Sequence, residues 1–208
     1  MFLILDFTNS FKMAILSNNI LIEKELKTKK NISEMLIFEI EKFFKKHEKN
    51  IKKIKTIYVI TGPGSFTGIR SALTFAKSLK LTIKLNIFGL SKFEIINYKV
   101  KIAKCAKLKC ILLHFKGNQF FKQTFRDNEA INEVQLIDFD NEKLNINRQT
   151  VYIYDDILLE SHFRDKISKK IKENFYLVSY NFQELKEIII HNMIVNNDPK
   201  PLYISNYY

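Results

Sequence analysis

The sequence predicts a protein of the α/β class, and three observations lead to this prediction. Short apolar runs of the kind that form buried strands alternate with segments whose apolar residues recur at helical spacing. Hydrophobic residues make up 46% and charged residues 27% of the sequence, which is ordinary for a globular protein. A chain of 208 residues is also long enough to bury a core in one large domain or in two small ones.

The N-terminal half opens with three apolar runs that are separated by polar turns. Asn and Ser, which favour tight turns, stand between the runs, so the runs predict a β-meander. The first of these turns carries Asp6, Thr8 and Asn9. Two further apolar runs follow, each of them after a predicted helix. The predicted strands of this half are residues 2–7, 12–17, 20–26, 56–60 and 86–90.

The first helix is predicted to run from a capping box, formed by Asn31 and Glu34, to about Lys46. At 100° per residue, one set of its apolar side chains shares an arc of about 120°, wide enough to seat the helix on a sheet. Met35 and Phe38 lie outside this arc, either as exposed single side chains or as a second packing surface. The apolar arc consists of Leu36, Ile37, Ile40, Phe43 and Phe44.

Residues 58–70 hold three of the five glycines and one of the three prolines in the chain. Glycine tolerates unusual backbone conformations and close contacts, so this clustering indicates a special strand-to-helix turn. Helix amides at such a turn can hold an anion. The Lys-Ser/Thr pair of a phosphate-binding P-loop is missing, which favours a turn that fixes the start of the helix. We call this segment the glycine turn; its residues of interest are Gly62, Pro63, Gly64, Ser65, Phe66, Thr67, Gly68 and Arg70.

The helix after the glycine turn, predicted over residues 67–80, has two contrasting faces. Its apolar face has the spacing needed to pack on the sheet. The other face carries the small hydroxyl side chains of Ser71, Thr74 and Ser78, where a free surface would usually carry Lys and Glu. This face therefore predicts contact with a partner helix.

The second half of the chain has weaker signals. A hairpin through Gly117 and Asn118 is the clearest of them. Helices are predicted over residues 92–103, 157–174 and 182–195. The predicted strands are residues 109–115, 119–126, 134–139, 151–154 and 175–180, with a strand-like tail at 201–204.

The formal charge of +12 suggests a nucleic-acid partner, because lysine and arginine neutralise phosphates. Two features weaken this interpretation. Only four arginines occur, although readers of bases and phosphates favour the arginine fork. Abundant Lys, Asn, Ile, Phe and Tyr, with few Gly, Pro and Ala, are also typical of a protein from an AT-rich genome.

The sequence predicts a cytoplasmic protein with no membrane segment. Asp6 interrupts the N-terminal apolar run too early for a signal peptide. No apolar run reaches the length of about 18 residues that a membrane span needs. Cys105 and Cys110 form no Cys-x-x-Cys pair, so we expect reduced thiols.

No catalytic residue and no metal site are predicted. The four histidines, His47, His114, His162 and His191, are too far apart in the sequence to form a recognisable ligand pair, and surface or filler roles are favoured. A carboxylate that stabilises its own turn is the favoured interpretation of Asp6.

Residues 62–70 closely resemble the Gly-Pro-Gly-Ser-Phe-Thr-Gly-Leu/Val-Arg signature of the TsaB (YeaZ) family. Three other segments resemble the family in register: residues 5–8, 88–91 and 201–204. The likeness is strong over residues 1–95, patchy to about 125 and weak beyond. The family's usual Asp-Ala-Arg is replaced by residues 114–116, and its arginine after the Pro-x-Tyr ending by Ser205.

The resemblance implies an actin-like ATPase (ribonuclease H-like) lobe with a mixed five-stranded sheet over residues 1–103. A smaller, diverged α/β lobe would occupy residues 104–208, leaving open whether the final helix or the tail packs back on the first lobe.

The resemblance also implies a non-catalytic scaffolding subunit of the tRNA N6-threonylcarbamoyladenosine synthase. Such a subunit binds a TsaD-like catalytic subunit and a TsaE-like ATPase, forms a homodimer when alone, and meets tRNA through the complex. No cofactor is expected, and a nucleotide at the partner interface remains open. The implied interface consists of Met35, Phe38, Lys42, Ser71, Thr74 and Ser78.

Two other functions remain open. A stand-alone actin-like ATPase or metallo-enzyme would bind ATP or metal by itself through Asp6, with Asp6 and Thr8 as the nucleotide-binding pair that the resemblance to actin-like ATPases implies. A direct tRNA-binding module would use the Lys-rich second half, with an affinity that falls steeply with salt.

Overall fold

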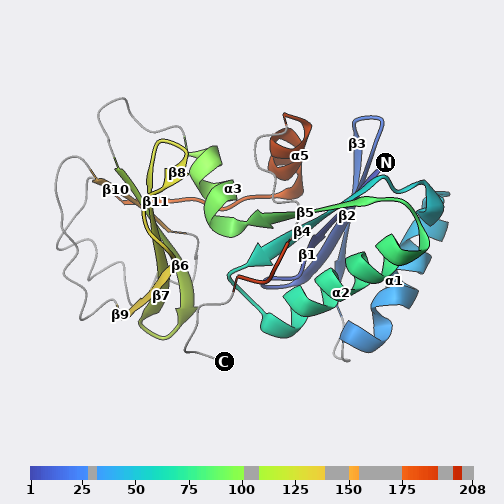
Figure 1. Cartoon of the computed structure of the whole chain (residues 1–208), viewed down its shortest axis with the longest axis horizontal. Helices are drawn as coiled ribbons and strands as arrows, with labels where there is room; N and C mark the ends of the chain where they lie inside the picture. The colour runs from blue at the N-terminus through green and yellow to red at the C-terminus, as the bar shows by residue number, and fades with distance from the viewer. Residues whose placement is uncertain (28–31, 101–107, 139–149, 155–174, 192–198, 203–208) are drawn as a thin grey trace. The chain divides into compact units, whose positions relative to one another are not determined.

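The computed structural model describes residues 1–27, 32–100, 108–138, 150–154, 175–191 and 199–202 (Figure 1). The chain divides into two compact units. The first comprises Met1–Lys92 with Asn181–Tyr203, and the second comprises Phe93–Tyr180 with Ile204–Tyr208. The expected division after residue 103 falls within 101–107, outside the described residues.

The first unit is built on one mixed sheet. Its strands are β1 (Phe2–Asp6), β2 (Phe11–Ser17), β3 (Ile20–Leu26), β4 (Thr56–Gly62) and β5 (Asn86–Ser91). The strand order is β3-β2-β1-β4-β5, with an antiparallel meander on one side and parallel pairs on the other. Asn18 and Asn19 take positive φ values of 49° and 63° between β2 and β3, as a two-residue hairpin turn requires. The mixed five-stranded sheet is therefore confirmed.

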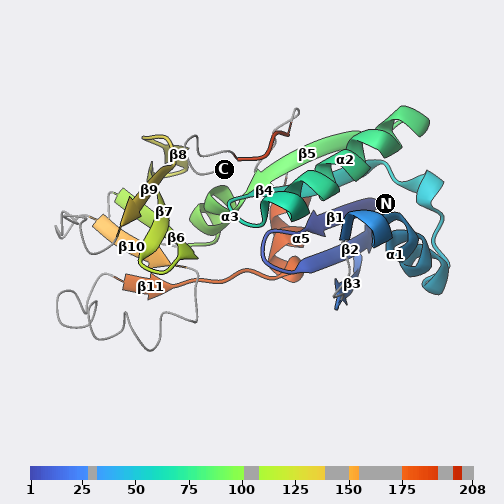
Figure 2. The same cartoon turned by 90° about the horizontal axis from the view of Figure 1, so that it is seen from below.

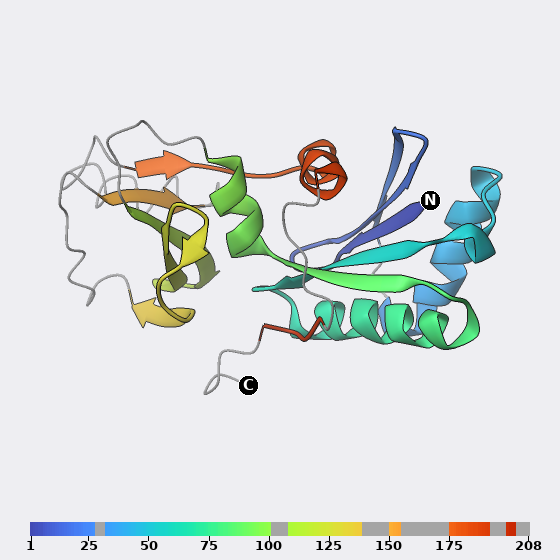
Figure 3. The same ribbon diagram turned by 45° about the horizontal axis from the view of Figure 1, so that its top comes forward.

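Helices cover both faces of this sheet. α1 (Ile32–Lys46) and α2 (Phe66–Thr82) lie side by side on one face, and α5 (Phe182–Ile190) lies on the other (Figures 2 and 3). A short 3-10 helix, η1 (Ile51–Lys53), follows α1. All seven residues of β4 are buried, because this strand lies inside the sheet between β1 and β5 and α2 packs on it. That burial explains why β4 reads in the sequence as a continuous apolar run.

The packing of α1 confirms most of the predicted apolar arc and corrects one member of it. Leu36, Ile40, Phe43 and Phe44 are all buried against the sheet. Ile37 is 63% exposed, so its predicted place in the core is wrong. It stands at the edge of the arc, and the sheet covers only the central stripe because α2 runs alongside α1.

The second unit contains a six-stranded sheet. Its elements are α3 (Lys92–Lys99), β6 (Leu108–Lys116), β7 (Gln119–Arg126), β8 (Glu129–Ala130), β9 (Gln135–Asp138), β10 (Thr150–Tyr154) and β11 (Phe175–Leu177). The order is β11-β10-β6-β7-β8, and β9 also pairs with β7. The predicted hairpin is confirmed, with Gly117 at φ +56° between β6 and β7. The short β8 was not predicted, because two exposed residues carry no periodicity.

Several predictions fall outside the described residues. These are the Asn31 cap, the helix over 157–174, the last part of the helices over 92–103 and 182–195, the end of the tail, and the state of Cys105. A capping box that the sequence reading missed begins α5, where Asn181 and Glu184 exchange two hydrogen bonds of 2.9 Å. In the parts of the chain that the structure describes, no helix is long and apolar enough to cross a membrane.

The contrast between two isoleucines of α1 tests this packing. Ile40→Ala should lower the free energy of unfolding by roughly 2–4 kcal/mol, because Ile40 is fully buried and its loss leaves a cavity. Ile37→Ala should change it by less than about 0.5 kcal/mol, because Ile37 is exposed. Urea denaturation of the two variants measures both values. Equal losses would contradict the assignment of Ile37 to the surface.

Candidate functional site: the paired helices α1 and α2

The glycine turn packs directly on the first turn of the meander. The backbone N–H of Ser65 donates to the carbonyl oxygen of Thr8 at 2.6 Å. A Cβ added to Gly64 would lie 2.4 Å from that oxygen, and one on Gly68 would lie 2.2 Å from the carbonyl oxygen of Phe7. Both separations are too short for real atoms, so this contact between two backbones requires glycine.

The start of the turn leads out of β4 and also meets the tail. Gly62 takes φ +115°, a conformation that glycine adopts readily, and the Gly62–Pro63 peptide bond is cis. A Cβ on Gly62 would lie 3.1 Å from Cδ1 of Ile69. The backbone N–H of Leu202 donates to the carbonyl oxygen of Thr61 at 2.9 Å. The described part of the tail therefore lies against the end of β4, within the first unit.

α2 begins at the end of the glycine turn. The hydroxyl oxygen of Ser65 accepts a hydrogen bond from the backbone N–H of Gly68 at 3.2 Å, which makes Ser65 the N-cap of the helix. The guanidinium carbon of Arg70 lies 3.6 Å from the ring centroid of Phe66, within cation–π distance. The glycine turn thus fixes the residue at which α2 starts. It thereby also fixes which side chains of the first helical turn of α2 lie at the surface.

Asp6 and Thr8 are joined by two local hydrogen bonds. One carboxylate oxygen of Asp6, Oδ1, accepts hydrogen bonds from the backbone N–H of Thr8 at 3.1 Å and from its hydroxyl at 2.7 Å. Thr8 is only 3% exposed. This geometry matches a carboxylate that stabilises its own turn. Among the described residues, no group of three or more His, Cys, Asp or Glu side chains is arranged to hold a metal ion.

A groove of about 440 Å³ runs between α1 and α2. It is lined by Leu36, Ile37, Phe66, Thr67, Arg70, Ser71, Thr74, Phe75 and Ser78. Thr74 and Ser78 are exposed along it. The hydroxyl of Ser71 donates to the carbonyl oxygen of Thr67 at 2.8 Å, so this polar group is turned back onto its own helix. Apart from Arg70, the side chains that line the groove are accordingly apolar or small.

The α1 residues of the expected interface lie apart from this groove. Phe38 is 59% exposed and, with Lys42, lines a second hollow of about 420 Å³ on the outer face of α1. Met35 is half-buried and lines neither hollow. Ile37, which was predicted to lie in the core, lines the groove instead, together with Leu36 of α1 and the hydroxyl residues of α2. The sequence feature that could have predicted its exposure is its place at the edge of the apolar arc of α1.

The architecture is that of proteins with the actin-like ATPase fold. The solved structure of a Bacteroides thetaiotaomicron protein with this fold is similar over 88% of this chain and 94% of that chain, with a TM-score of 0.51 and 12% identity. The structure of YeaZ from Pseudomonas aeruginosa is similar over 98% of this chain and 99% of that chain, with a TM-score of 0.65 and 10% identity. At such low identities, these likenesses establish the fold alone.

The sequence comparisons establish the family. A family model described as "TsaD: tRNA N6-adenosine threonylcarbamoyltransferase" matches residues 14–118, half of the chain. The tRNA threonylcarbamoyladenosine biosynthesis protein TsaB of Buchnera aphidicola subsp. Acyrthosiphon pisum is 22% identical over 93% of this chain and 78% of its own length. The chain belongs to the TsaB (YeaZ) family, whose members are tRNA threonylcarbamoyladenosine biosynthesis proteins.

Other relatives match a smaller share of their own length. TsaB of Buchnera aphidicola subsp. Schizaphis graminum is 26% identical over 65% of this chain and 57% of that protein. The uncharacterized MG208 homolog of Mycoplasma pneumoniae is 32% identical over 30% of this chain and 32% of that protein. The chain therefore spans about a third of one of these relatives and just over half of the other.

Substitution of Gly68 tests the contact on which α2 depends. At an ordinary helical position, Gly→Ala stabilises a protein by roughly 1 kcal/mol. Gly68→Ala should instead destabilise the protein by about 1–3 kcal/mol, because the new methyl group meets the carbonyl oxygen of Phe7. Urea denaturation gives the sign.

Gly117→Ala is the matched control in the second unit. A Cβ there meets no atom within 4 Å, so its cost comes only from the positive φ of +56° and should be about 1 kcal/mol. A stabilising Gly68→Ala would show that the backbone contact leaves room for a side chain.

Proposed function

We propose that this protein is a non-catalytic scaffolding subunit of the tRNA N6-threonylcarbamoyladenosine synthase. In this proposal it binds a TsaD-like catalytic subunit through the outer face of α1 and α2, and a TsaE-like ATPase joins the assembly. Alone, it forms a homodimer through the same face. It meets the adenosine next to the anticodon of tRNA only as part of the complex. The family membership supports a part in tRNA threonylcarbamoyladenosine biosynthesis, and the exposed face of α1 and α2 supports the scaffolding role.

The observation that carries the proposal is the exposed apolar surface along these two helices. Ile37 and Phe38 are 63% and 59% exposed on neighbouring positions of α1. A monomer gains nothing from leaving two large apolar side chains in water, whereas an interface buries them at about 25 cal/mol per Å². The small side chains of Thr74 and Ser78 on α2 allow a second helix to approach closely.

The arrangement of polar residues supports a non-catalytic role. Asp6 hydrogen-bonds within its own turn, and its partner Thr8 is buried. The glycine turn packs on backbone carbonyl oxygens, which repel rather than attract an anion. We therefore propose that any nucleotide in the complex is held mainly by the partner subunits at the interface.

An arginine in the groove tests the interface. Thr74→Arg should weaken binding of the TsaD-like subunit at least 100-fold, about 2.7 kcal/mol, because a long charged side chain would be buried between helices. The fold should be unaffected, since Thr74 is exposed. Isothermal titration calorimetry measures the affinity, and circular dichroism checks the fold.

Gln135→Arg is the matched control, because it adds the same charge at an exposed position of β9 in the second unit. It should leave the affinity within about twofold of the wild type. If Thr74→Arg binds the TsaD-like subunit as well as the control does, the groove is not the interface.

A measurement of ATP binding to the isolated chain distinguishes a stand-alone ATPase from the proposed scaffold. The isolated wild-type chain should show no heat of binding with millimolar ATP and Mg²⁺. Asp6→Ala should lower stability by about 1–2 kcal/mol, because Thr8 loses two hydrogen-bond acceptor contacts. Saturable ATP binding that Asp6→Ala abolishes would replace the scaffold proposal with the enzyme.

A further inference from the structure

Lysines are concentrated at one end of the first unit. Residues 42–55 and 77–84 make up about a tenth of the chain but hold ten of its 30 lysines and one carboxylate, Glu48. A protein that merely prefers lysine on its surface would spread these residues evenly. We call this cluster the basic end; it consists of Lys42, Lys45, Lys46, Lys49, Lys52, Lys53, Lys55, Lys77, Lys80 and Lys84.

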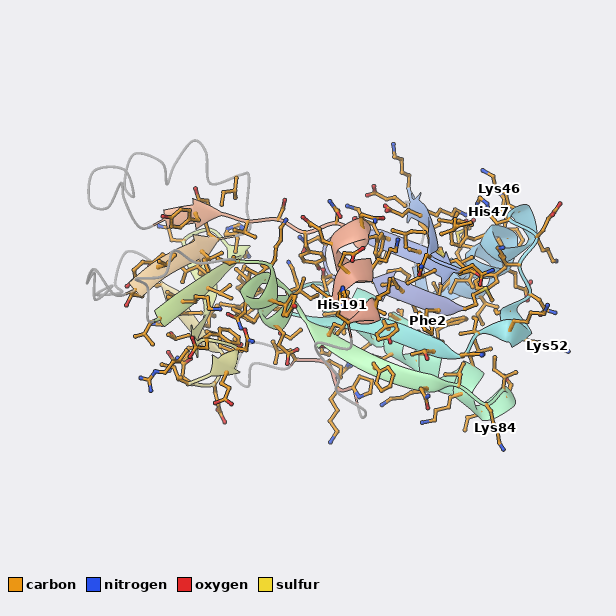
Figure 4. All side chains as sticks on the ribbon, turned by 90° about the horizontal axis from the view of Figure 1, so that it is seen from above. Phe2, Lys46, His47, Lys52, Lys84 and His191 are labelled. Atoms are coloured by element: carbon orange, nitrogen blue, oxygen red, sulfur yellow. The ribbon has the colours of Figure 1, made fainter. Side chains whose placement is uncertain are left out.

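The two segments meet where the parallel strands begin. The backbone N–H of Lys55 donates to the carbonyl oxygen of Met1 at 3.0 Å, and that of Asn86 donates to the carbonyl oxygen of Lys55 at 2.9 Å. These bonds bring together the starts of β1, β4 and β5, next to η1 and the end of α2. Figure 4 shows Lys46, Lys52 and Lys84 at this same end of the unit, pointing outward.

The positive charge of the basic end is not neutralised within the described part of the chain. Nine of the ten lysines are exposed, and Lys49 is half-buried. None of the ten forms an ion pair with a described residue, in contrast to Lys24, which lies 2.7 Å from a carboxylate oxygen of Glu39. Such a concentration of like charge costs free energy unless an anion binds to it.

Helix ends account for only part of the cluster. Lys45 and Lys46 lie in the last turn of α1 and Lys80 in that of α2, where a positive charge offsets the partial negative charge of the helix terminus. Lys49, Lys55 and Lys84 lie outside any helix and gain nothing from this effect.

We propose that the basic end binds the phosphate backbone of the RNA that the complex modifies. This inference rests on the proposed function, and it adds a direct contact between this subunit and RNA. Lysine is a compact charge that neutralises phosphates without reading bases, so the contact is independent of sequence and sensitive to salt. An anionic membrane fits less well: within the described residues of the basic end, Leu81, at 89% exposed, is the single large apolar side chain available for insertion.

This surface differs from the one that the sequence suggested. The tRNA-binding alternative used the Lys-rich second half of the chain, whereas the basic end belongs entirely to the first unit. Three of its lysines, Lys52, Lys53 and Lys84, line neither the groove nor the hollow beside Phe38, so the contacts with RNA and with protein can be disrupted separately.

A triple variant tests the proposal. Lys52→Gln, Lys53→Gln and Lys84→Gln together remove three exposed charges. Affinity for an unmodified tRNA transcript, measured by fluorescence anisotropy with the full chain, should fall on the order of 10–100-fold at low salt. The slope of log affinity against log salt concentration should become shallower by about 2–3.

A control triple removes the same charge elsewhere. Lys12→Gln, Lys27→Gln and Lys116→Gln alter exposed lysines, of which Lys12 stands opposite Asp6 in the β1–β2 register, at the other end of the sheet. This control should retain tRNA affinity within about threefold. Equal loss in both triples, or no loss in the first, would overturn the proposal. So would loss of binding to phosphatidylserine vesicles with tRNA binding intact, since that result assigns the basic end to a membrane.

Binding to the TsaD-like subunit is measured on the same variants. The Lys52/Lys53/Lys84 variant should bind that subunit normally, because none of these lysines lines the groove or the hollow beside Phe38. If the wild-type chain fails to bind the subunit but binds tRNA through these lysines, the proposed function fails and the RNA contact stands. If the subunit binds while tRNA affinity is unchanged in the triple, only the RNA contact fails.

Discussion

The first unit depends on one contact between two pieces of backbone. The glycine turn lies so close to the carbonyl oxygens of Phe7 and Thr8 that no side chain fits at Gly64 or Gly68. The Ser65 N–H to Thr8 bond of 2.6 Å closes this contact. It joins the carboxyl end of β1 to the amino end of α2, and through α2 it determines which side chains stand next to α1. A change in this turn would therefore displace the whole helical face, although none of its glycines contacts a partner in our proposal.

The outer face of α1 and α2 carries apolar side chains because the two helices have more of them than the sheet can bury. The sheet buries the central stripe of α1 and the apolar side of α2. The remaining apolar side chains, Ile37 and Phe38, are left at the surface beside small hydroxyl residues. In an isolated monomer this arrangement is unfavourable, because large apolar area remains in water without compensation. In a subunit of an assembly it is the expected composition of an interface core, which is poor in charge and rich in apolar surface.

Two surfaces of the same two helices thus have opposite physical character. Along the groove the surface is mainly apolar, with Arg70 as the single charged side chain of its lining, which suits a protein partner. At their C-terminal ends it is strongly basic, which suits a polyanion. A scaffold that holds an enzyme and also attracts its RNA needs both properties, and both surfaces belong to the first unit. Long-range attraction by the lysines would raise the local concentration of RNA near the complex.

The sequence by itself determined the α/β class, the β-meander, the glycine turn and the buried stripe of α1, because each depends on local spacing or on residues with special backbone properties. Residues 62–70, nine residues within the glycine turn, also pointed to the family, since a close backbone contact tolerates so few substitutions. Only the tertiary structure decided that the Ile37 side chain is exposed, since a side chain at the edge of an apolar arc is buried or exposed according to the elements packed beside it. The same holds for the basic end: its lysines come from two segments, and the sheet brings them together only when β1, β4 and β5 pair.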